Sequence, residues 1–249
     1  MTRPVSHRLL LRYGTIAAAA ALVCTSCSGS GSGGTAAPPP ASASPAASSS
    51  AVPSADPLDP AAIKAAMKKS TAVHVKGSAS KKDGKMKVDL QFNKDSVSGS
   101  IEKDGVVVPV LRVGDKVWMK FSDSLAKSSG VPAAGAAMLR DKWVSLDSKL
   151  GQGLGEAFKL FLDFDIFVSS MASEADQPGY GFGQPADAAG TLALRYQNDD
   201  TTIFIEAVEP HRLLRMESPK EGTMEFTGWD QPVPAKAPPA EEIFSGPGS

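Results

Sequence analysis

Residues 85–92 read Lys85-Met86-Lys87-Val88-Asp89-Leu90-Gln91-Phe92. Polar and apolar side chains alternate at every position of this stretch. Because successive side chains of a β-strand point to opposite faces, such a strand has one buried face and one solvated face. Burial on one side only is typical of antiparallel sheets. The stretch therefore predicts a strand of an antiparallel sheet whose apolar side faces a core.

Further strand-like segments surround this one, at residues 73–79, 97–101, 106–113, 117–121 and 143–146. The turns Asp104-Gly105 and Gly114-Asp115 separate three of them, and an Asp-Gly pair between two strands is a strong hairpin signal. Connections this short join antiparallel neighbours and leave no room for crossover helices. This half of the folded region is therefore predicted to be a meander.

The C-terminal half adds four more predicted strands, at residues 192–197, 203–206, 213–217 and 223–227. Residues 172–190 precede them and are rich in Gly, Pro and Asp. That composition favours turns over strands, so we expect a mobile loop there.

Two helices are predicted. Asp59-Pro60 is a typical helix start, with Asp as N-cap and Pro at the first helical position, and this short helix should end near Ser70. Residues 154–171 form the longer helical pattern, which is largely apolar. A helix of this composition needs an apolar surface to lie on, and the inner face of the sheet is available. Residues 122–140 have only weak helical character.

The N-terminus has the features of an export signal. Arg3, Arg8 and Arg12 precede the apolar run 14–23, which is too short to span a bilayer. Thr25-Ser26-Cys27 then resembles a bacterial lipobox, in which the cysteine receives a diacylglyceryl anchor. The position three residues before Cys27 is occupied by Cys24, where a lipobox usually has Leu. Cys24 as the acceptor and an ordinary secretory signal remain as alternatives.

These features divide the chain into three parts: a lipoprotein signal peptide at 1–26, the lipidated Cys27 with a Ser/Gly/Pro/Ala-rich linker to residue 58, and one folded domain at 59–245. The linker cannot bury enough apolar surface to offset the entropy of ordering it. We therefore expect a domain tethered by lipid to the extracytoplasmic face of the cell membrane.

Composition excludes several classes of function. The formal net charge of −1 does not suit nucleic-acid binding, which requires clustered Lys and Arg. Cys24 and Cys27 are the only cysteines, so the folded part has no disulfide and no cysteine-ligated metal. Of the three histidines, His74 and His211 lie in the folded part, and neither has a partner at metal-site or triad spacing. We expect no enzyme, metal or cofactor beyond the anchor.

The order of these elements resembles a known family. The segments Glu209-Pro210-His211-Arg212-Leu213 and Gly222-Thr223-Met224-Glu225-Phe226-Thr227-Gly228-Trp229 look like the end of the LolA-like half-barrel lipoproteins, and within them the LppX/LprG group of actinobacterial envelopes. The resemblance spans about residues 59–244. It implies an α+β fold, a strongly curved antiparallel sheet with helices covering its concave face. Residues 172–190 depart from it, because the family would have a further strand there.

The resemblance also implies an apolar cavity for acyl chains between sheet and helices. The residues expected to line it are Val88, Leu90, Phe92, Met119 and Phe121 from the sheet, with Phe158, Phe161 and Leu162 from the helix. The first hypothesis is a monomeric envelope lipoprotein that binds or carries a hydrophobic acylated ligand. The second is a sensor or protein-interaction module of the same fold, in which these residues fill a core. An envelope transporter or another protein partner remains open in both.

Overall fold

The computed structural model describes residues 59–81, 84–151 and 155–246. The predicted signal peptide at 1–26, Cys24, the predicted lipidation site Cys27 and the linker to residue 58 lie outside the described residues. The description below concerns the folded domain.

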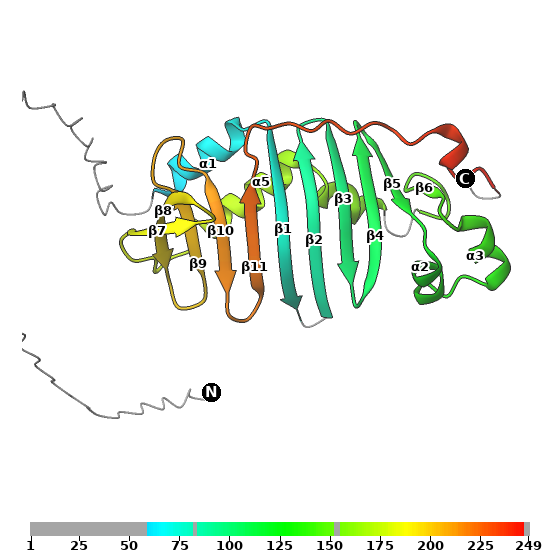
Figure 1. Ribbon diagram of the computed structural model, residues 1–249, viewed down its shortest axis with the longest axis horizontal. Coiled ribbons are helices and arrows are strands. Elements are labelled where there is room, and N and C mark those ends of the chain that lie inside the picture. The colour runs from blue at the N-terminus through cyan, green and yellow to red at the C-terminus, as the bar shows by residue number, and fades with distance from the viewer. Residues whose placement is uncertain (1–58, 82–83, 152–154, 247–249) are drawn as a thin grey trace, which may run out of the picture. The chain divides into compact units, whose positions relative to one another are not determined.

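The described residues contain one open antiparallel sheet of eleven strands in the order β6-β5-β4-β3-β2-β1-β11-β10-β9-β8-β7 (Figure 1). The first six strands are β1 (Ala72–Lys81), β2 (Gly84–Asn93), β3 (Ser96–Lys103), β4 (Val106–Val113), β5 (Lys116–Lys120) and β6 (Trp143–Ser145). The other five are β7 (Gln184–Ala188), β8 (Thr191–Gln197), β9 (Thr202–Glu206), β10 (Leu213–Ser218) and β11 (Gly222–Thr227). Strands β1 and β11 join the two meanders at the centre.

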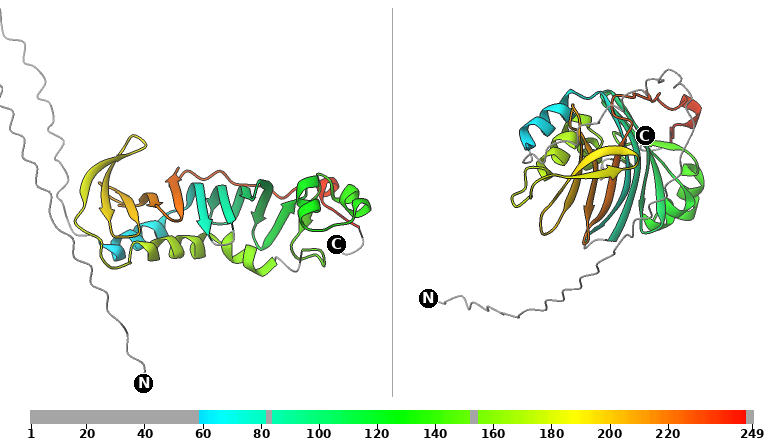
Figure 2. Two further views of the ribbon diagram at one scale, coloured as in Figure 1. Left: turned by 90° about the horizontal axis from the view of Figure 1, so that it is seen from below. Right: turned by 60° about the vertical axis from the view of Figure 1, so that its left-hand side comes forward.

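The helices are α1 (Pro60–Lys69), α2 (Asp123–Ser128), α3 (Ala133–Leu139), α4 (Gly155–Phe161) and α5 (Phe164–Glu174), followed by a short 3₁₀ helix at Ala240–Glu242. Figure 2 shows α1 and α5 as a second layer under the curved sheet, whereas α2 and α3 lie at the β6 end. The predicted α+β class, an antiparallel sheet with helices over one face, is confirmed.

The alternation in β2 places its residues as predicted. Val88, Leu90 and Phe92 are buried, whereas Lys85 and Lys87 are exposed. The inner face continues across the sheet, since Leu90 lies opposite Val75, and Val75 lies opposite Phe226. A single apolar face therefore runs from the first meander to the second.

Helix α1 forms where its sequence predicts. The Asp59 carboxylate accepts hydrogen bonds from the backbone N–H groups of Ala61 and Ala62 at 3.0 and 3.1 Å. Ser70 ends the helix, and Ile63 and Met67 are buried on its inner side. This helix packs along α5 (Figure 1).

The single long helix predicted over residues 154–171 is wrong, because two helices, α4 and α5, occupy this region. Asp163 separates them by acting as the N-cap of α5, with its carboxylate accepting from the N–H of Ile166 at 3.0 Å. Arg112, on the inner side of β4, donates to the carbonyl oxygen of Leu162 at 3.2 Å and pairs with the Asp163 carboxylate at 3.2 Å. The apolar pattern runs on through the break, so periodicity alone does not reveal it.

The loop predicted at residues 172–190 is also partly wrong. Its first residues complete α5 through Glu174, and its last residues form the edge strand β7. The strand reads Gln184-Pro185-Ala186-Asp187-Ala188, which is poor in strand-forming residues. Proline is tolerated here because β7 pairs only with β8, and its other side needs no backbone donor. The further strand expected from the family resemblance is thus present.

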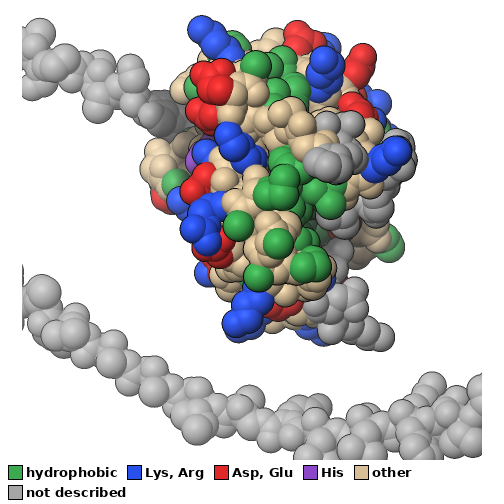
Figure 3. Space-filling model, turned by 90° about the vertical axis from the view of Figure 1, so that its right-hand side faces the viewer, with side chains coloured by type: hydrophobic (Ala, Val, Ile, Leu, Met, Phe, Trp, Pro, Cys, Tyr) green, Lys and Arg blue, Asp and Glu red, His purple; other side chains and the backbone are tan. Residues whose placement is uncertain are grey.

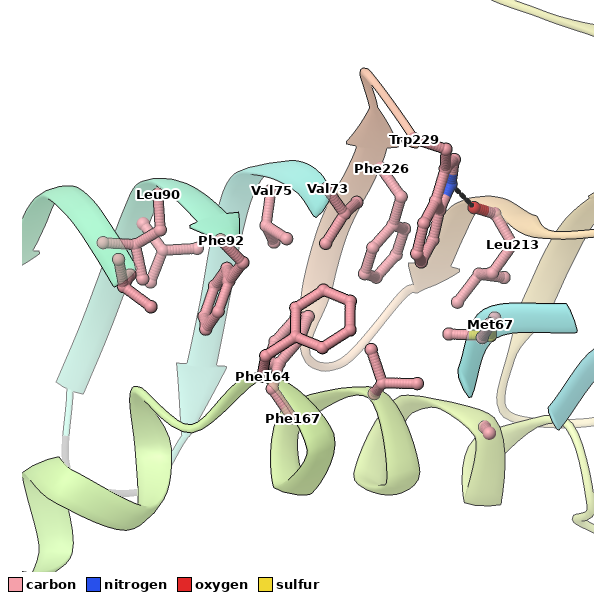
Figure 4. Packing of buried hydrophobic residues seen from close by; sticks show 14 of the residues in the cluster. Met67, Val73, Val75, Leu90, Phe92, Phe164, Phe167, Leu213, Phe226 and Trp229 are labelled. Atoms are coloured by element: carbon pink, nitrogen blue, oxygen red, sulfur yellow. Dashed lines mark hydrogen bonds between the residues drawn. The ribbon is translucent and has the colours of Figure 1, made fainter. Parts of the chain in front are cut away.

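Aromatic packing fixes α5 on the sheet (Figure 4). The rings of Phe92 and Phe167 stack with centroids 4.3 Å apart and an angle of 16° between their planes, and Phe226 lies 6.4 Å from Phe167 on the other side. Phe164, one turn earlier, is 1% exposed. These contacts hold the first half of α5 against β2 and β11.

The C-terminal segment crosses one end of the strands (Figure 1). The buried Asn93 amide accepts from the N–H of Val233 at 2.8 Å and donates to its carbonyl oxygen at 3.0 Å. Ser96 accepts from the N–H of Ala235 at 3.1 Å, and Phe244 donates to the carbonyl oxygen of Trp143 at 2.8 Å. The tail therefore covers the end at which β2 turns into β3.

The β6 end of the domain has its own small core. Phe121, Ala126, Leu139 and Val144 are buried together there, with Phe244 of the tail against them. Figure 3 shows hydrophobic side chains gathered over this end, where Met138 of α3 is 56% exposed.

We predict that Phe167→Ala lowers the free energy of unfolding by about 3–5 kcal/mol, because it removes the ring stacked on Phe92 and leaves a cavity. Urea denaturation followed by circular dichroism measures the change. Phe182→Ala is the matched control, since this side chain is 67% exposed and should change stability by less than about 0.5 kcal/mol. Equal losses for both variants would contradict the role assigned to Phe167.

Candidate functional site

A cavity of about 270 Å³ lies between the inner face of the sheet and the helices α4 and α5. This volume equals about nine water molecules at about 30 Å³ each, and it is just below the range of about 300–1,000 Å³ usual for ligand pockets. The sheet contributes Val75, Ala79, Met86, Val88, Leu90 and Phe92 to its wall, and the helices contribute Leu160, Phe161, Ile166, Phe167 and Met171. The wall is mainly apolar.

The cavity is partly open to solvent. Leu160 of α4 and Ile166 of α5 line it and are 55% and 42% exposed. The stacked rings of Phe92 and Phe167 form another part of its wall.

Methionine is concentrated in this wall. Met86, Met171, Met216 and Met224, four of the eight methionines of the chain, line the cavity, and all four are only partly buried. Gly77 makes room for one of them, since a Cβ atom there would lie 2.9 Å from the Met224 sulfur. Unbranched methionine side chains adapt to irregular partners. The wall can therefore change shape around an apolar chain.

Five of the lining residues are polar: Ser170, Glu174, Thr201, Ser218 and Glu221. Among the described residues that line the cavity there is no Lys or Arg. The cavity thus combines an apolar interior with hydroxyl and carboxylate groups.

Of the eight residues predicted to line the cavity, four do so in the structure and four lie elsewhere. Val88, Leu90, Phe92 and Phe161 line the cavity. Leu162 and Met119 are buried in the main core, and Phe158 packs against that core, so these three lie outside the lining. Phe121 belongs to the small core at the β6 end. Leu162 lies in the break between α4 and α5, and its side chain packs in the main core instead of lining the cavity.

Sequence reasoning missed Phe167, Met171, Met216 and Met224. Met86 belongs to the same alternation as Val88 and could have been included on that basis. Met216 and Met224 lie directly opposite each other on β10 and β11, which only the strand register reveals.

Residues 209–213 and 222–229, on which the family resemblance rests, contact each other around Trp229. Its indole N–H donates to the carbonyl oxygen of Leu213 at 2.9 Å (Figure 4), and the Arg212 guanidinium lies 5.8 Å from its ring. Arg212 also binds both oxygens of Glu206, and the neighbouring Asp230 carboxylate. This network joins the end of β9 and the residue before β10 to the residues after β11.

The outer face of β1 and β2 carries polar side chains, among them Lys76, Ser78 and Asp89, around a hollow of about 540 Å³. The Asp89 carboxylate lies 2.7 Å from Nε2 of His74 and 2.9 Å from the Lys76 ammonium group. The hydrogen bond from His74, and then that from Lys76, lowers the pKa of Asp89 below its usual range. Among the described residues there is no group of three or more His, Cys, Asp or Glu side chains placed to hold a metal ion.

We predict that Asp89→Asn destabilises the protein at pH 7 by a few tenths of a kcal/mol to about 1 kcal/mol, because the network is largely solvent-exposed. The pKa of Asp89 is lowered by folding, so its contribution is present above the unfolded pKa of about 3.9 and is lost as the pH falls through the lower folded value. Urea titrations at pH 7 and pH 2.5 test this. A difference between variant and wild type that stays the same at both pH values would contradict it.

Comparisons with known proteins concern the fold. No family model matches the sequence, and no curated protein matches it. Solved structures are similar to it. One of them is the crystal structure of LprF from Mycobacterium bovis, with a TM-score of 0.48 and 15% sequence identity over 71% of this chain and 93% of the LprF chain.

At this level of identity, neither ligand nor location transfers from LprF to this chain. No helix among the described residues is long and apolar enough to cross a membrane.

Proposed function

We propose that this protein is a membrane-anchored envelope lipoprotein that binds one acyl chain of a lipid in the cavity under its sheet. The observation that carries the proposal is the cavity itself, about 270 Å³ of space in an otherwise packed inner face, with a wall of aliphatic, aromatic and methionine side chains. Transfer of a flexible hydrocarbon chain from water into an apolar space of this kind lowers the free energy of the system.

The volume sets the scale of binding. A methylene group is close to a water molecule in size, so the space accepts about nine of them. Each buried methylene contributes about 0.8 kcal/mol, which gives about 7 kcal/mol in total. Association costs at least about 4 kcal/mol, so this volume supports reversible rather than permanent binding of one chain. Movement of the methionines would admit a longer chain.

The anchor completes the proposal. Two acyl chains on Cys27 would hold the protein on the membrane, whereas one chain gives only marginal binding. A flexible linker of about 30 residues has a root-mean-square length of roughly 30 Å, which leaves the cavity within reach of the bilayer surface. A non-catalytic role in binding or carrying lipid follows.

The alternative function is a sensor or interaction module with a filled core. It requires that the inner-face side chains pack without space between them. The cavity beside Leu90 and Met86 does not support that requirement, and we therefore prefer the lipid-binding proposal.

We predict that Ala79→Phe weakens the binding of a 12-carbon acyl probe by about tenfold or more, because the ring occupies space in which at least about two methylene groups would be buried. Calorimetric titration of residues 28–249, which retain every described residue, measures the affinity. Ser78→Phe is the control, since Ser78 is exposed on the opposite face of β1. Unchanged binding by a folded Ala79→Phe variant, or no binding by the wild type, would contradict lipid binding in this cavity.

For the anchor, we predict that Cys27→Ser releases the protein from the membrane fraction of the native envelope, whereas Cys24→Ser leaves it there. The reason is that the thioether forms on the cysteine that becomes the mature N-terminus. Membrane fractionation and mass spectrometry of the N-terminal peptide provide the measurement. Release by Cys24→Ser alone would move the anchor to Cys24, and retention of both variants would contradict lipidation.

A further inference from the structure

The methionines of the domain fall into three groups that differ in their access to solvent. Seven of the eight methionines of the chain lie among the described residues. Met67 of α1 and Met119 of β5 are 0% and 3% exposed, whereas Met138 of α3 is 56% exposed and lies outside the cavity lining. The other four are partly buried and line the cavity: Met86, Met171, Met216 and Met224.

The four cavity methionines come from four different elements. Met216 of β10 lies directly opposite Met224 of β11. Met86 lies on β2, which only β1 separates from β11, and Met171 comes from α5. All four side chains pack against the main hydrophobic core. The sheet and the helix layer therefore both contribute thioether groups to the space that would hold an acyl chain.

These thioethers are the readiest targets for an oxidant in the folded domain. Thiols and thioethers are the side-chain groups that peroxides oxidise, and the only cysteines of the chain, Cys24 and Cys27, precede the folded domain. The cavity is partly open, because Leu160 and Ile166 line it and are largely exposed. A molecule as small as hydrogen peroxide can therefore enter and reach its wall.

The reaction of a thioether with hydrogen peroxide needs no further reactant. A lone pair of the sulfur attacks one peroxide oxygen, the O–O bond breaks and an S–O bond forms. The other oxygen leaves as hydroxide, takes the proton of the transferred hydroxyl and is released as water. The sulfur is oxidised and the peroxide is reduced. The product, methionine sulfoxide, is polar where the thioether was apolar.

A sulfoxide in this wall opposes the binding of a hydrocarbon chain. Its oxygen is a hydrogen-bond acceptor that water satisfies when the cavity is empty. An acyl chain has no donor to offer, so its entry removes the water and leaves the oxygen without a partner. The wall is mainly apolar before oxidation. Each sulfoxide therefore weakens the interaction on which the proposed lipid binding depends.

We propose that Met86, Met171, Met216 and Met224 are sites of oxidation by peroxide, and that their conversion to methionine sulfoxide releases lipid from the cavity. This inference rests on the proposed lipid-binding function and adds a chemical control of it. Bound lipid covers the same wall, so these four methionines are oxidised more slowly in the lipid-bound protein than in the empty protein.

Peroxide treatment of residues 28–249, which retain every described residue and contain no cysteine, tests the proposal. After removal of the peroxide with catalase, calorimetric titration with monolauroylglycerol gives the affinity, and peptide mass spectrometry gives the sulfoxide fraction at each methionine. We expect sulfoxide at the four cavity positions and at Met138, little at Met67 and Met119, and an affinity at least about tenfold lower. Circular dichroism should show that the treated protein is still folded.

Leucine variants assign the effect to the cavity, because leucine is close to methionine in volume and forms no sulfoxide. The affinity of the fourfold variant Met86→Leu/Met171→Leu/Met216→Leu/Met224→Leu should change by less than about twofold on treatment. The double variant Met216→Leu/Met224→Leu, which disturbs the packing less, should lose less affinity than the wild type. Met138→Leu is the matched control and should lose as much affinity as the wild type, since Met138 lies outside the cavity lining.

The outcomes separate this inference from the function on which it rests. Unchanged affinity despite sulfoxide at the cavity positions, absence of sulfoxide there, unfolding of the treated protein, or equal losses in the double variant and the wild type would overturn the inference and leave the lipid-binding function intact. The same holds if saturating lipid does not slow oxidation at the four positions. Absence of binding by the untreated wild type would overturn both.

Discussion

The stacking of Phe167 on Phe92 is the contact on which the arrangement of the domain depends. An open sheet of eleven strands with one apolar face is stable only if another layer covers that face, and α5 is the central element of that layer. The rings lie 4.3 Å apart, and Phe226 and Phe164 surround them. Helix α1 then packs along α5, so its position follows from the same contact.

The cavity lies where the aromatic packing between α5 and the sheet ends. The first half of α5 is held by aromatic rings, whereas elsewhere in the cavity wall the sheet presents Met86, Met216 and Met224. The tail, held by Asn93 and Ser96, covers the opposite strand ends. The inner space is therefore packed at the aromatic rings and adaptable at the methionines.

The alternation of polar and apolar residues predicted the strands well, because in each such segment the apolar residues mark the buried face. The segment 85–92 and the hairpin turn at Asp104-Gly105 are examples. The errors occurred where a contact distant in sequence decided the outcome. Arg112 binds Leu162 and Asp163, and the predicted long helix becomes two. Pairing with β8 makes a strand of residues 184–188, although their composition favours a loop.

The sequence by itself determined the alternating strands and the helix start at Asp59, because period and capping are local properties. Only the tertiary structure decided which apolar residues line space and which fill it. Phe121 and Leu162 are as apolar as Phe92, yet the first joins a separate core and the second packs in the main core outside the cavity lining. That Glu174 and Glu221 line one cavity likewise depends on strand register and helix placement, since a cavity exists only between elements that fold together.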